Sequence, residues 1–399
     1  MSPLVRLGAF WFVYMGAVGI FFPFFSLYLG ESAGLSGFEV GAVVSALPVV
    51  GMVAQPLWGQ LADRSGARGR VLALVAAGAG LAQLAVAGAQ GFAALLAATA
   101  LLAVFWTSAI PMAMSVSLAI LRDAGRHAFG IARACGTVGY LVLVVSFPPV
   151  LRGAFGGGAN GAAPPGLAWM FPAIAVLALA GAAIALTLPR EGAVSLRAPH
   201  DGLRQLLRHP PMLRLLAYCF AVHLFINGPI QLFPLFVRSL GGGIEDVSRM
   251  WIWMVLLEIP LMALSGTLLA RLGSRRLLGL GVVAAGVRWA GSGLVAGLAI
   301  TSALGLLHGL VVVGLGIGAT LYVEESVPEP LRSTGQALLA TVGVGAGGIV
   351  SNLACGWLFD HVGARATYLG CGAGALALGL VVSWALPHAR RAASLQAAG

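Results

Sequence analysis

The sequence predicts an all-α polytopic membrane protein with twelve transmembrane helices, arranged as two pseudo-symmetric six-helix bundles. Composition is the first observation: 59% of the 399 residues are hydrophobic and 9% are charged, whereas a soluble domain is roughly 45–50% apolar and about 25% charged. The second observation is a series of apolar runs whose length is close to the ~20 residues that a helix needs to cross a bilayer. These runs are continuously apolar, which favours helices over a barrel of alternating strands. The third is a set of short motifs that recurs in the second half.

Glycine, proline and charged residues separate the apolar runs and so define the spans. The predicted spans are residues 6–29, 38–62, 70–90, 92–120, 127–151, 166–188, 211–238, 247–270, 275–296, 299–322, 333–357 and 364–386. The spans form an N-terminal bundle over residues 1–188 and a C-terminal bundle over residues 211–399. A basic cytoplasmic connector, residues 189–210, joins the two bundles.

The basic residues indicate how the chain is oriented. All 23 of them are arginine, and the formal net charge is +10. Most lie in the loops on one side of the predicted helices, and the positive-inside rule places that side, with both termini, in the cytoplasm. The arginines are scattered without interleaved aromatic residues, which argues for a lipid bilayer as partner and against nucleic acid. We expect a monomer of the bacterial inner membrane.

The four cysteines have no metal-ligand spacing. Cys135, Cys219, Cys355 and Cys371 all lie in apolar stretches, where a thiol serves as a small packing residue. We therefore expect neither a metal nor a cofactor.

An internal repeat supports the division into halves. The first copy is Gly59, Leu61, Arg64, Gly66 and Arg68, and 207 residues later the second is Gly266, Leu268, Arg271, Gly273 and Arg275. The second copy has Ala270 where the first has Asp63. Parallel halves of this kind place a substrate site near the midplane between them, with alternating access by rocking of one half against the other.

Residues 59–70 read Gly-Gln-Leu-Ala-Asp-Arg-Ser-Gly-Ala-Arg-Gly-Arg and resemble the loop between helices two and three of the major facilitator superfamily. In that family the loop latches the cytoplasmic face in the outward-open state. The resemblance implies a gating loop made of Gly59, Asp63, Arg64, Gly66 and Arg68. Gly59 would permit close helix approach, and Asp63 would cap or pair at a helix end.

Within the superfamily the chain resembles the proton symporters of the lactose permease and phenylpropionate permease group, over nearly its whole length. The matching motifs are Phe22-Pro23-Phe24-Phe25, Gln55-Pro56-Leu57-Trp58-Gly59, Phe129-Gly130-Ile131-Ala132-Arg133, Val287-Arg288 and Leu307-His308. The resemblance implies that Arg133 binds substrate, that Arg288 assists deprotonation, and that His308 is the helix-ten histidine of the group.

The chain also departs from the group, because several of its carboxylates are missing. The helix-four glutamate falls at Met114 or Ser115, and the helix-ten glutamate becomes Val311. The loss of acids with retention of arginines favours an aromatic or other organic carboxylate as substrate, with sugars or nucleosides as the alternative.

Glu258 and Arg288 lie at the same depth in adjacent predicted spans. Glu258 is 13 residues before Arg271, and Arg288 is 12 residues after Arg276, so both lie roughly 18–20 Å from the cytoplasmic helix ends. A charge inside an apolar span is costly and usually functional. We expect a proton switch, with Glu258 as carrier and Arg288 as the charge that discharges it; a static bridge between the two helices is the alternative.

The other polar residues have two interpretations each. Arg133 presents a guanidinium suited to a carboxylate, or its side chain extends to the interface. His308 couples protons or packs through a hydrogen bond. His223, Asn227 and Gln231 recur at i, i+4 and i+8, and this stripe lines the cavity or bonds a neighbouring helix. Tyr140 stacks on substrate or packs the bundle.

These observations predict a secondary active transporter, not an enzyme, which imports a small organic solute together with a proton by alternating access. A facilitative uniporter or a drug or metabolite exporter on the same fold is the second hypothesis. The third hypothesis is an integral-membrane enzyme or receptor. The sequence does not support it, because we find no His-rich metal motif, no catalytic triad and no extramembrane ligand-binding domain.

Overall fold

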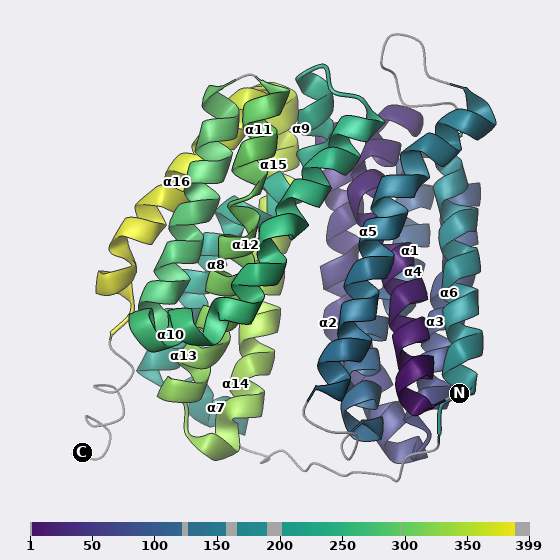
Figure 1. The fold of residues 1–399 in the computed structure, drawn as a ribbon. Coiled ribbons are helices and arrows are strands. Elements are labelled where there is room, and N and C mark those ends of the chain that lie inside the picture. The colour runs from purple at the N-terminus through teal and green to yellow at the C-terminus, as the bar shows by residue number, and fades with distance from the viewer. Residues whose placement is uncertain (1, 122–126, 157–165, 190–201, 296, 388–399) are drawn as a thin grey trace. The chain divides into compact units, whose positions relative to one another are not determined.

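The computed structural model describes residues 2–121, 127–156, 166–189, 202–295 and 297–387, and within these ranges the secondary structure is helical, without a β-strand. The chain divides into two compact units. The first comprises residues 1–196 with 241–248, and the second comprises residues 197–240 with 249–399 (Figure 1). Part of the predicted connector, residues 190–201, lies outside the described residues.

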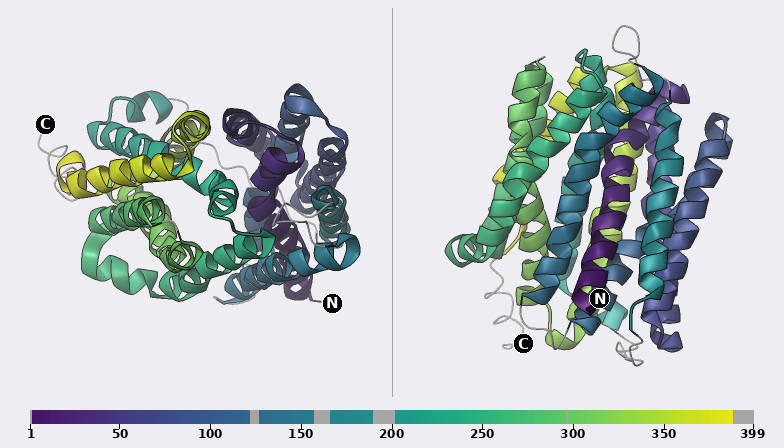
Figure 2. Two further views of the ribbon diagram at one scale, coloured as in Figure 1. Left: turned by 90° about the horizontal axis from the view of Figure 1, so that it is seen from above. Right: turned by 45° about the vertical axis from the view of Figure 1, so that its right-hand side comes forward.

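The first unit is a bundle of long helices, which Figure 2 shows end-on. Its elements are α1 (Pro3–Leu27) with the π-helical extension η1 (Tyr28–Ser32), α2 (Gly37–Ser65), α3 (Arg68–Gly88), α4 (Gly91–Ile120), α5 (Ala128–Phe155), the short η3 (Leu167–Trp169) and α6 (Met170–Leu186). Helix α1 packs against α5 and α6, α2 against α4, and α3 against α4 and α6. Each predicted span of residues 1–188 corresponds to one of these helices.

Helix α1 is the most buried of the candidate membrane spans, because α5 approaches it very closely. At Gly139 of α5, an added Cβ atom would lie only 2.0 Å from the carbonyl oxygen of Phe12. The absence of a side chain there allows the two backbones to touch. Helix α1 fills the remaining space with rings, such as Phe10 stacked on Tyr14 with centroids 5.6 Å apart.

The second unit contains the remaining helices, apart from residues 244–248 at the start of one of them, which belong to the first unit. These helices are α7 (Gly202–Leu206), α8 (Pro210–Gln231), α9 (Phe233–Ser239), α10 (Ile244–Leu294), α11 (Leu298–Gly305), α12 (His308–Val311), η4 (Val312–Gly318), α13 (Ala319–Ser326), η5 (Glu329–Leu331), α14 (Arg332–Leu338), η6 (Leu339–Ala346), α15 (Gly347–His361) and α16 (Ala364–Ala385). The segments η4 and η6 are π-helical, so two of the predicted spans continue through a wider helical turn.

Helix α10 contains two predicted spans, 247–270 and 275–296, joined at Gly273. The backbone there is non-helical, with φ 74° and ψ 163°, and so separates two limbs of α10. Among the described residues eleven helices are long and apolar enough to cross a membrane. The one within α10 is Leu264–Leu294, which includes Gly273 and the whole limb after it. Gly66, the repeat partner of Gly273, ends α2 with a φ of 60°, so both copies place a left-handed glycine at the same turn.

The second unit also contains a contact made by two glycines. An added Cβ at Gly281 of α10 would lie 2.8 Å from the Cα of Gly314 in η4, and one at Gly314 would lie 2.5 Å from the Cα of Gly281. The two backbones therefore touch without any side chain between them, as small residues allow in membrane bundles.

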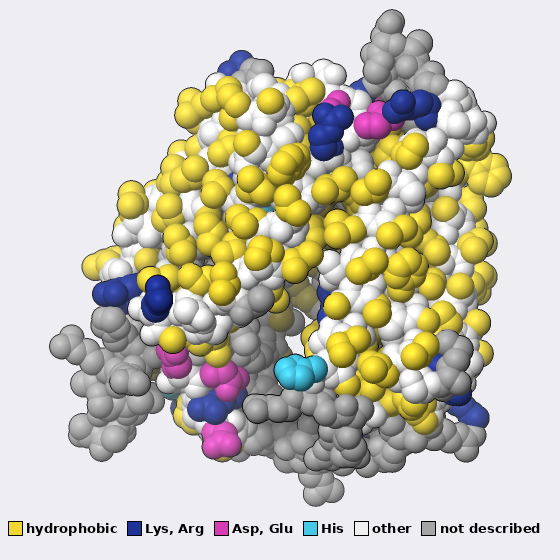
Figure 3. Space-filling model, in the orientation of Figure 1, with side chains coloured by type: hydrophobic (Ala, Val, Ile, Leu, Met, Phe, Trp, Pro, Cys, Tyr) yellow, Lys and Arg dark blue, Asp and Glu magenta, His cyan; other side chains and the backbone are white. Residues whose placement is uncertain are grey.

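The visible surface agrees with a membrane-spanning bundle. Figure 3 shows hydrophobic side chains over the middle of each unit on this face, whereas charged side chains gather near the helix ends. Leu380 and Trp384 of α16, which are 80% and 88% exposed, are suited to contact with lipid.

Candidate functional site

In the first unit, the guanidinium of Arg133 lies against the indole ring of Trp11. Its Cζ atom is 4.9 Å from the ring centroid. Trp11 is fully buried, and its Nε1–H group donates a hydrogen bond of 3.0 Å to Ser117 Oγ. Arg133 of α5 thus contacts a ring of α1, and α4 holds that ring through Ser117. A guanidinium is also able to donate to carboxylate or hydroxyl oxygens.

Tyr140 lies two turns further along α5 and is 8% exposed. Its carbonyl oxygen faces Gly19 of α1, where an added Cβ would be 2.6 Å away. The residue therefore belongs to the α1–α5 contact, and a role in substrate binding stays a prediction. Trp106 of α4 packs against rings of α1, with its centroid 5.5 Å from that of Tyr14 and 4.9 Å from that of Phe21.

In the second unit, Arg288 is almost completely buried, with 1% of its surface exposed. It lies on the second limb of α10, and its Nη2 group donates to the sulfur of Met254 on the first limb, 3.2 Å away. The guanidinium also packs against two rings, with its Cζ 4.0 Å from the centroid of Trp289 and 5.1 Å from that of Phe233. Both limbs of α10, together with α9, enclose this charge.

The second hydrogen bond of Arg288 fixes the protonation state of His308. The bond joins Nη1 of Arg288 and Nδ1 of His308 over 2.9 Å. A guanidinium only donates, so Nδ1 accepts and the ring proton of His308 is on Nε2. A doubly protonated imidazole has no acceptor, so this bond and proton uptake by His308 exclude each other.

Glu258 lies one helical turn after Met254 and is half-buried. Its backbone packs against Gly309, the residue after His308, because an added Cβ at Gly309 would lie 2.8 Å from the Glu258 nitrogen. The three residues predicted to couple protons, Glu258, Arg288 and His308, are therefore close together within one unit. The described hydrogen bonds of Arg288 go to His308 and Met254, and a Glu258–Arg288 switch stays a prediction.

Several donors beside this cluster have no hydrogen-bond partner among the described residues. They are Nε of Arg288, Nε1 of Trp289 and Oγ of Ser292, which all lie on the second limb of α10 and are buried. A buried donor without a partner costs free energy, so such groups are normally satisfied by water or by a ligand.

The polar stripe of α8 faces α15. His223 donates from Nδ1 to the carbonyl oxygen of Cys219, 2.7 Å away in its own helix. Added Cβ atoms at Gly347 and Gly348 of α15 would come within 3.1 Å of the Cβ of His223 and 2.2 Å of Nδ2 of Asn227. Gln231, the third residue of the stripe, is half-buried at the end of α8.

The predicted gating loop forms the turn from α2 to α3. Arg68 Nη2 and Asp63 Oδ1 form an ion pair of 2.7 Å, and the side chain of Arg64 is exposed. The expectation that Gly59 permits close helix approach is wrong for this structure, because an added Cβ there would meet no atom within 4 Å.

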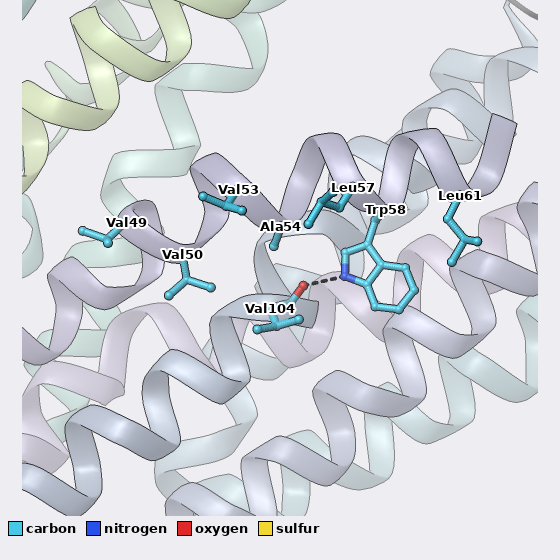
Figure 4. A pocket seen from close by; sticks show the side chains of 8 residues that line it. All are labelled: Val49, Val50, Val53, Ala54, Leu57, Trp58, Leu61 and Val104. Atoms are coloured by element: carbon cyan, nitrogen blue, oxygen red, sulfur yellow. Dashed lines mark hydrogen bonds between the residues drawn. The ribbon is translucent and has the colours of Figure 1, made fainter. Parts of the chain in front are cut away.

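A groove with a volume of about 540 Å³ lies on α2 and α4 of the first unit (Figure 4). It is lined by Val49, Val50, Val53, Ala54, Leu57, Trp58, Leu61 and Val104. The indole Nε1–H of Trp58 already donates to the carbonyl oxygen of Val104, 2.8 Å away. The lining therefore offers no side-chain hydrogen bond to a polar solute, and the groove does not compete with Arg133 as a recognition site.

Trp11, Ser117, Met254 and Trp289 hold the two arginines but were not singled out from the sequence. They are ordinary residues of apolar spans, and no motif distinguishes them from packing residues. Among the described residues, no three His, Cys, Asp or Glu side chains gather as metal ligands would.

Comparison with known proteins gives a consistent result. A model of the MFS_1 like family matches residues 4–370. The chain is 31% identical to the maltose permease of Geobacillus stearothermophilus, over 90% of this chain and 89% of that protein. It is 27% identical to sugar efflux transporter A of Dickeya chrysanthemi, over 80% and 78% of the two chains. Its fold is similar to the crystal structure of a point mutant of the nucleoside transporter NupG, with a TM-score of 0.85, 16% identity, and coverage of 97% of this chain and 100% of that chain.

Proposed function

Since this chain belongs to the MFS_1 like family and is a multi-pass transporter of the major facilitator type, we propose that it imports a sugar or a nucleoside together with a proton. It acts as a monomer in the bacterial inner membrane, with both termini in the cytoplasm. Transport proceeds by alternating access, and the substrate contacts include Arg133 and the polar stripe His223, Asn227 and Gln231.

The hydrogen bond between Arg288 and His308 is the main observation in support of proton coupling. It joins a permanent cation to a titratable ring inside an apolar unit, with Glu258 packed beside them. A proton taken up by Glu258 changes the charge next to Arg288, and a proton taken up by His308 breaks the bond. Either event alters the contact that Arg288 makes between α10 and α12. Protonation is thereby connected directly with a conformational change.

We rank the candidate substrates by the names of the related proteins. One relative is named a maltose permease and another a sugar efflux transporter, which favours a sugar over the organic carboxylate that the sequence favoured first. The donors at Arg288, Trp289 and Ser292 that have no partner among the described residues also suit the hydroxyl groups of a sugar.

An aromatic carboxylate is the second candidate. The specific observation in its favour is Arg133 on α5, whose Cζ atom lies 4.9 Å from the Trp11 ring centroid, because a guanidinium is the side-chain group best suited to bidentate recognition of a carboxylate. Exchange of this residue for Lys would weaken uptake of a carboxylate far more than uptake of a sugar.

The test uses the purified full chain in proteoliposomes with an imposed pH gradient, inside alkaline. Maltose, uridine and 3-phenylpropionate are supplied as radiolabelled probes, and counterflow without a gradient is measured in parallel. We expect a sugar or nucleoside to accumulate and the aromatic acid to fail. Protein-free liposomes under the same gradient measure the passive uptake of the weak acid. Accumulation of the acid alone, above that passive level, would replace the first proposal by the second.

The variant Glu258→Gln isolates the proton step, because it removes the acid and keeps the shape. We expect it to lose accumulation against a gradient and to retain counterflow. The matched control is Glu329→Gln, which changes an exposed acid of η5 and should behave as the parent protein. If Glu258→Gln still accumulates substrate, Glu258 is not the carrier.

A further inference from the structure

Two thiols face each other where the last two helices of the second unit meet. The sulfur atoms of Cys355 in α15 and Cys371 in α16 are 3.4 Å apart. Both residues are buried, with 2% and 5% exposed surface. The proposed transport mechanism uses neither of them, and simple packing does not require two sulfurs in contact.

The pair lies across a helical hairpin. Cys355 is six residues before the end of α15 at His361, and Cys371 is seven residues after the start of α16 at Ala364. At ~1.5 Å per residue, both lie about 9–11 Å from the connecting turn. A disulfide has sulfurs ≈ 2.05 Å apart, so from 3.4 Å the two atoms need to approach by about 1.3 Å, which small side-chain and helix shifts supply.

Helix α8 also contacts this site. An added Cβ at Gly228 would lie 2.5 Å from Cys355 Sγ, and the Gly228 N–H group donates a 2.7 Å hydrogen bond to Ser351 Oγ, one turn before Cys355. Gly228 directly follows Asn227 of the polar stripe. A shift of Cys355 towards Cys371 therefore changes the α8–α15 contact next to a proposed substrate residue.

We propose that Cys355 and Cys371 form a reversible redox site, which a peroxide oxidises to a disulfide that slows transport. One thiolate sulfur attacks a peroxide oxygen and the O–O bond breaks, giving a sulfenic acid and, after proton transfer, one water. The second thiol attacks that sulfur and releases another water as the S–S bond forms. In total, two thiols lose two electrons and two protons, and hydrogen peroxide is reduced to two waters.

The direct test needs no knowledge of the substrate. The variant with Cys135→Ser and Cys219→Ser keeps only the pair, and the variant Cys355→Ser removes one member. Each purified full-length protein is treated with hydrogen peroxide, alkylated after denaturation and mapped by mass spectrometry. We expect a peptide cross-linked between residues 355 and 371 in the first variant, lost on treatment with dithiothreitol. Full alkylation of both thiols after peroxide would overturn the proposal.

The functional consequence is measured by counterflow with the probe that the uptake panel identifies. We expect peroxide to lower the initial rate of the pair-only variant at least fivefold and dithiothreitol to restore it, with no effect on Cys355→Ser. If Cys355→Ser does not fold, Cys371→Ala serves the same purpose. A disulfide that forms without any change in rate would overturn the regulatory part of the proposal.

Discussion

Arg288 and His308 form a hydrogen bond of 2.9 Å between Nη1 and Nδ1 that leaves the ring of His308 neutral, with its proton on Nε2. The two residues come from the second limb of α10 and from α12, and the arginine is nearly fully buried. The bond therefore joins two membrane helices through one specific proton arrangement. The acceptor role of His308 can be tested by substitution, because a replacement side chain either keeps or removes the hydrogen-bond acceptor.

The first prediction concerns this acceptor. Because His308 only accepts from Arg288, His308→Asn should keep the bond and retain at least half of the counterflow rate. His308→Lys places a second cation beside a buried guanidinium and should reduce the rate more than tenfold. The control is His361→Asn, since this histidine is exposed at the end of α15. Equal rates for the Asn and Lys variants would contradict the acceptor role.

The second prediction concerns the ring beneath Arg133. A cation–π contact is worth about 0.5–2 kcal/mol, which corresponds to roughly a 2- to 30-fold change in affinity. Trp11→Leu removes the ring and should raise the KM of uptake within that range. Trp11→Phe keeps an aromatic face and should raise KM less, as should Ser117→Ala, which removes only the hydrogen bond to the indole. Measurement of KM and maximal rate separates a binding effect from loss of folded protein.

The third prediction compares one substitution at two places in the same helix. Gly139→Ala forces a methyl group against the carbonyl of Phe12, and overpacking of this kind costs about 1–3 kcal/mol. Gly130→Ala meets no atom within 4 Å and should stabilise α5 slightly, because alanine is the better helix former. Thermal unfolding in detergent should therefore shift down for the first variant and not for the second. A shift of equal size in both would mean that α1 and α5 do not touch at Gly139.

The fourth prediction concerns the gating loop. The Asp63–Arg68 pair is partly exposed, with Asp63 50% accessible, so it should contribute only about 0–1 kcal/mol to stability. Asp63→Asn is expected to leave the unfolding temperature almost unchanged. The pair is proposed to stabilise one conformation of the transport cycle. Asp63→Asn should therefore lower the transport rate by up to about fivefold, the equivalent of ~1 kcal/mol. The exchanged pair Asp63→Arg with Arg68→Asp should recover much of the rate.

Most of the fold follows from the sequence because apolar length and turn residues are local signals. The predicted spans 38–62 and 364–386 agree with α2 and α16 to within a few residues. The break at Leu232, which divides span 211–238 into α8 and α9, was not predicted, and neither was the π-helical winding of η4 and η6. Such features depend on how backbone carbonyls are satisfied by neighbouring helices, which composition does not encode.

The candidate site was only partly accessible from the sequence. Arg133, Glu258 and Arg288 stand out because a charge in an apolar span is rare. Their surroundings do not stand out: Trp11, Met254 and Trp289 are typical residues of membrane helices, and only tertiary packing brings them to the guanidinium groups. Depth along a helix predicted that Glu258 and Arg288 lie in one region, but it did not predict that His308 accepts the hydrogen bond of Arg288.

The contact between Gly281 and Gly314 has a consequence for the speed of conformational change. Side chains that interlock must leave their rotamers before two helices can slide past each other, and each such step adds to the activation barrier. Where two backbones touch without side chains, as in this contact, sliding requires no such step. The contact at Gly281 and Gly314 therefore adds no rotamer barrier when α10 and η4 slide past each other, which makes it a suitable place for rapid relative movement of the two helices.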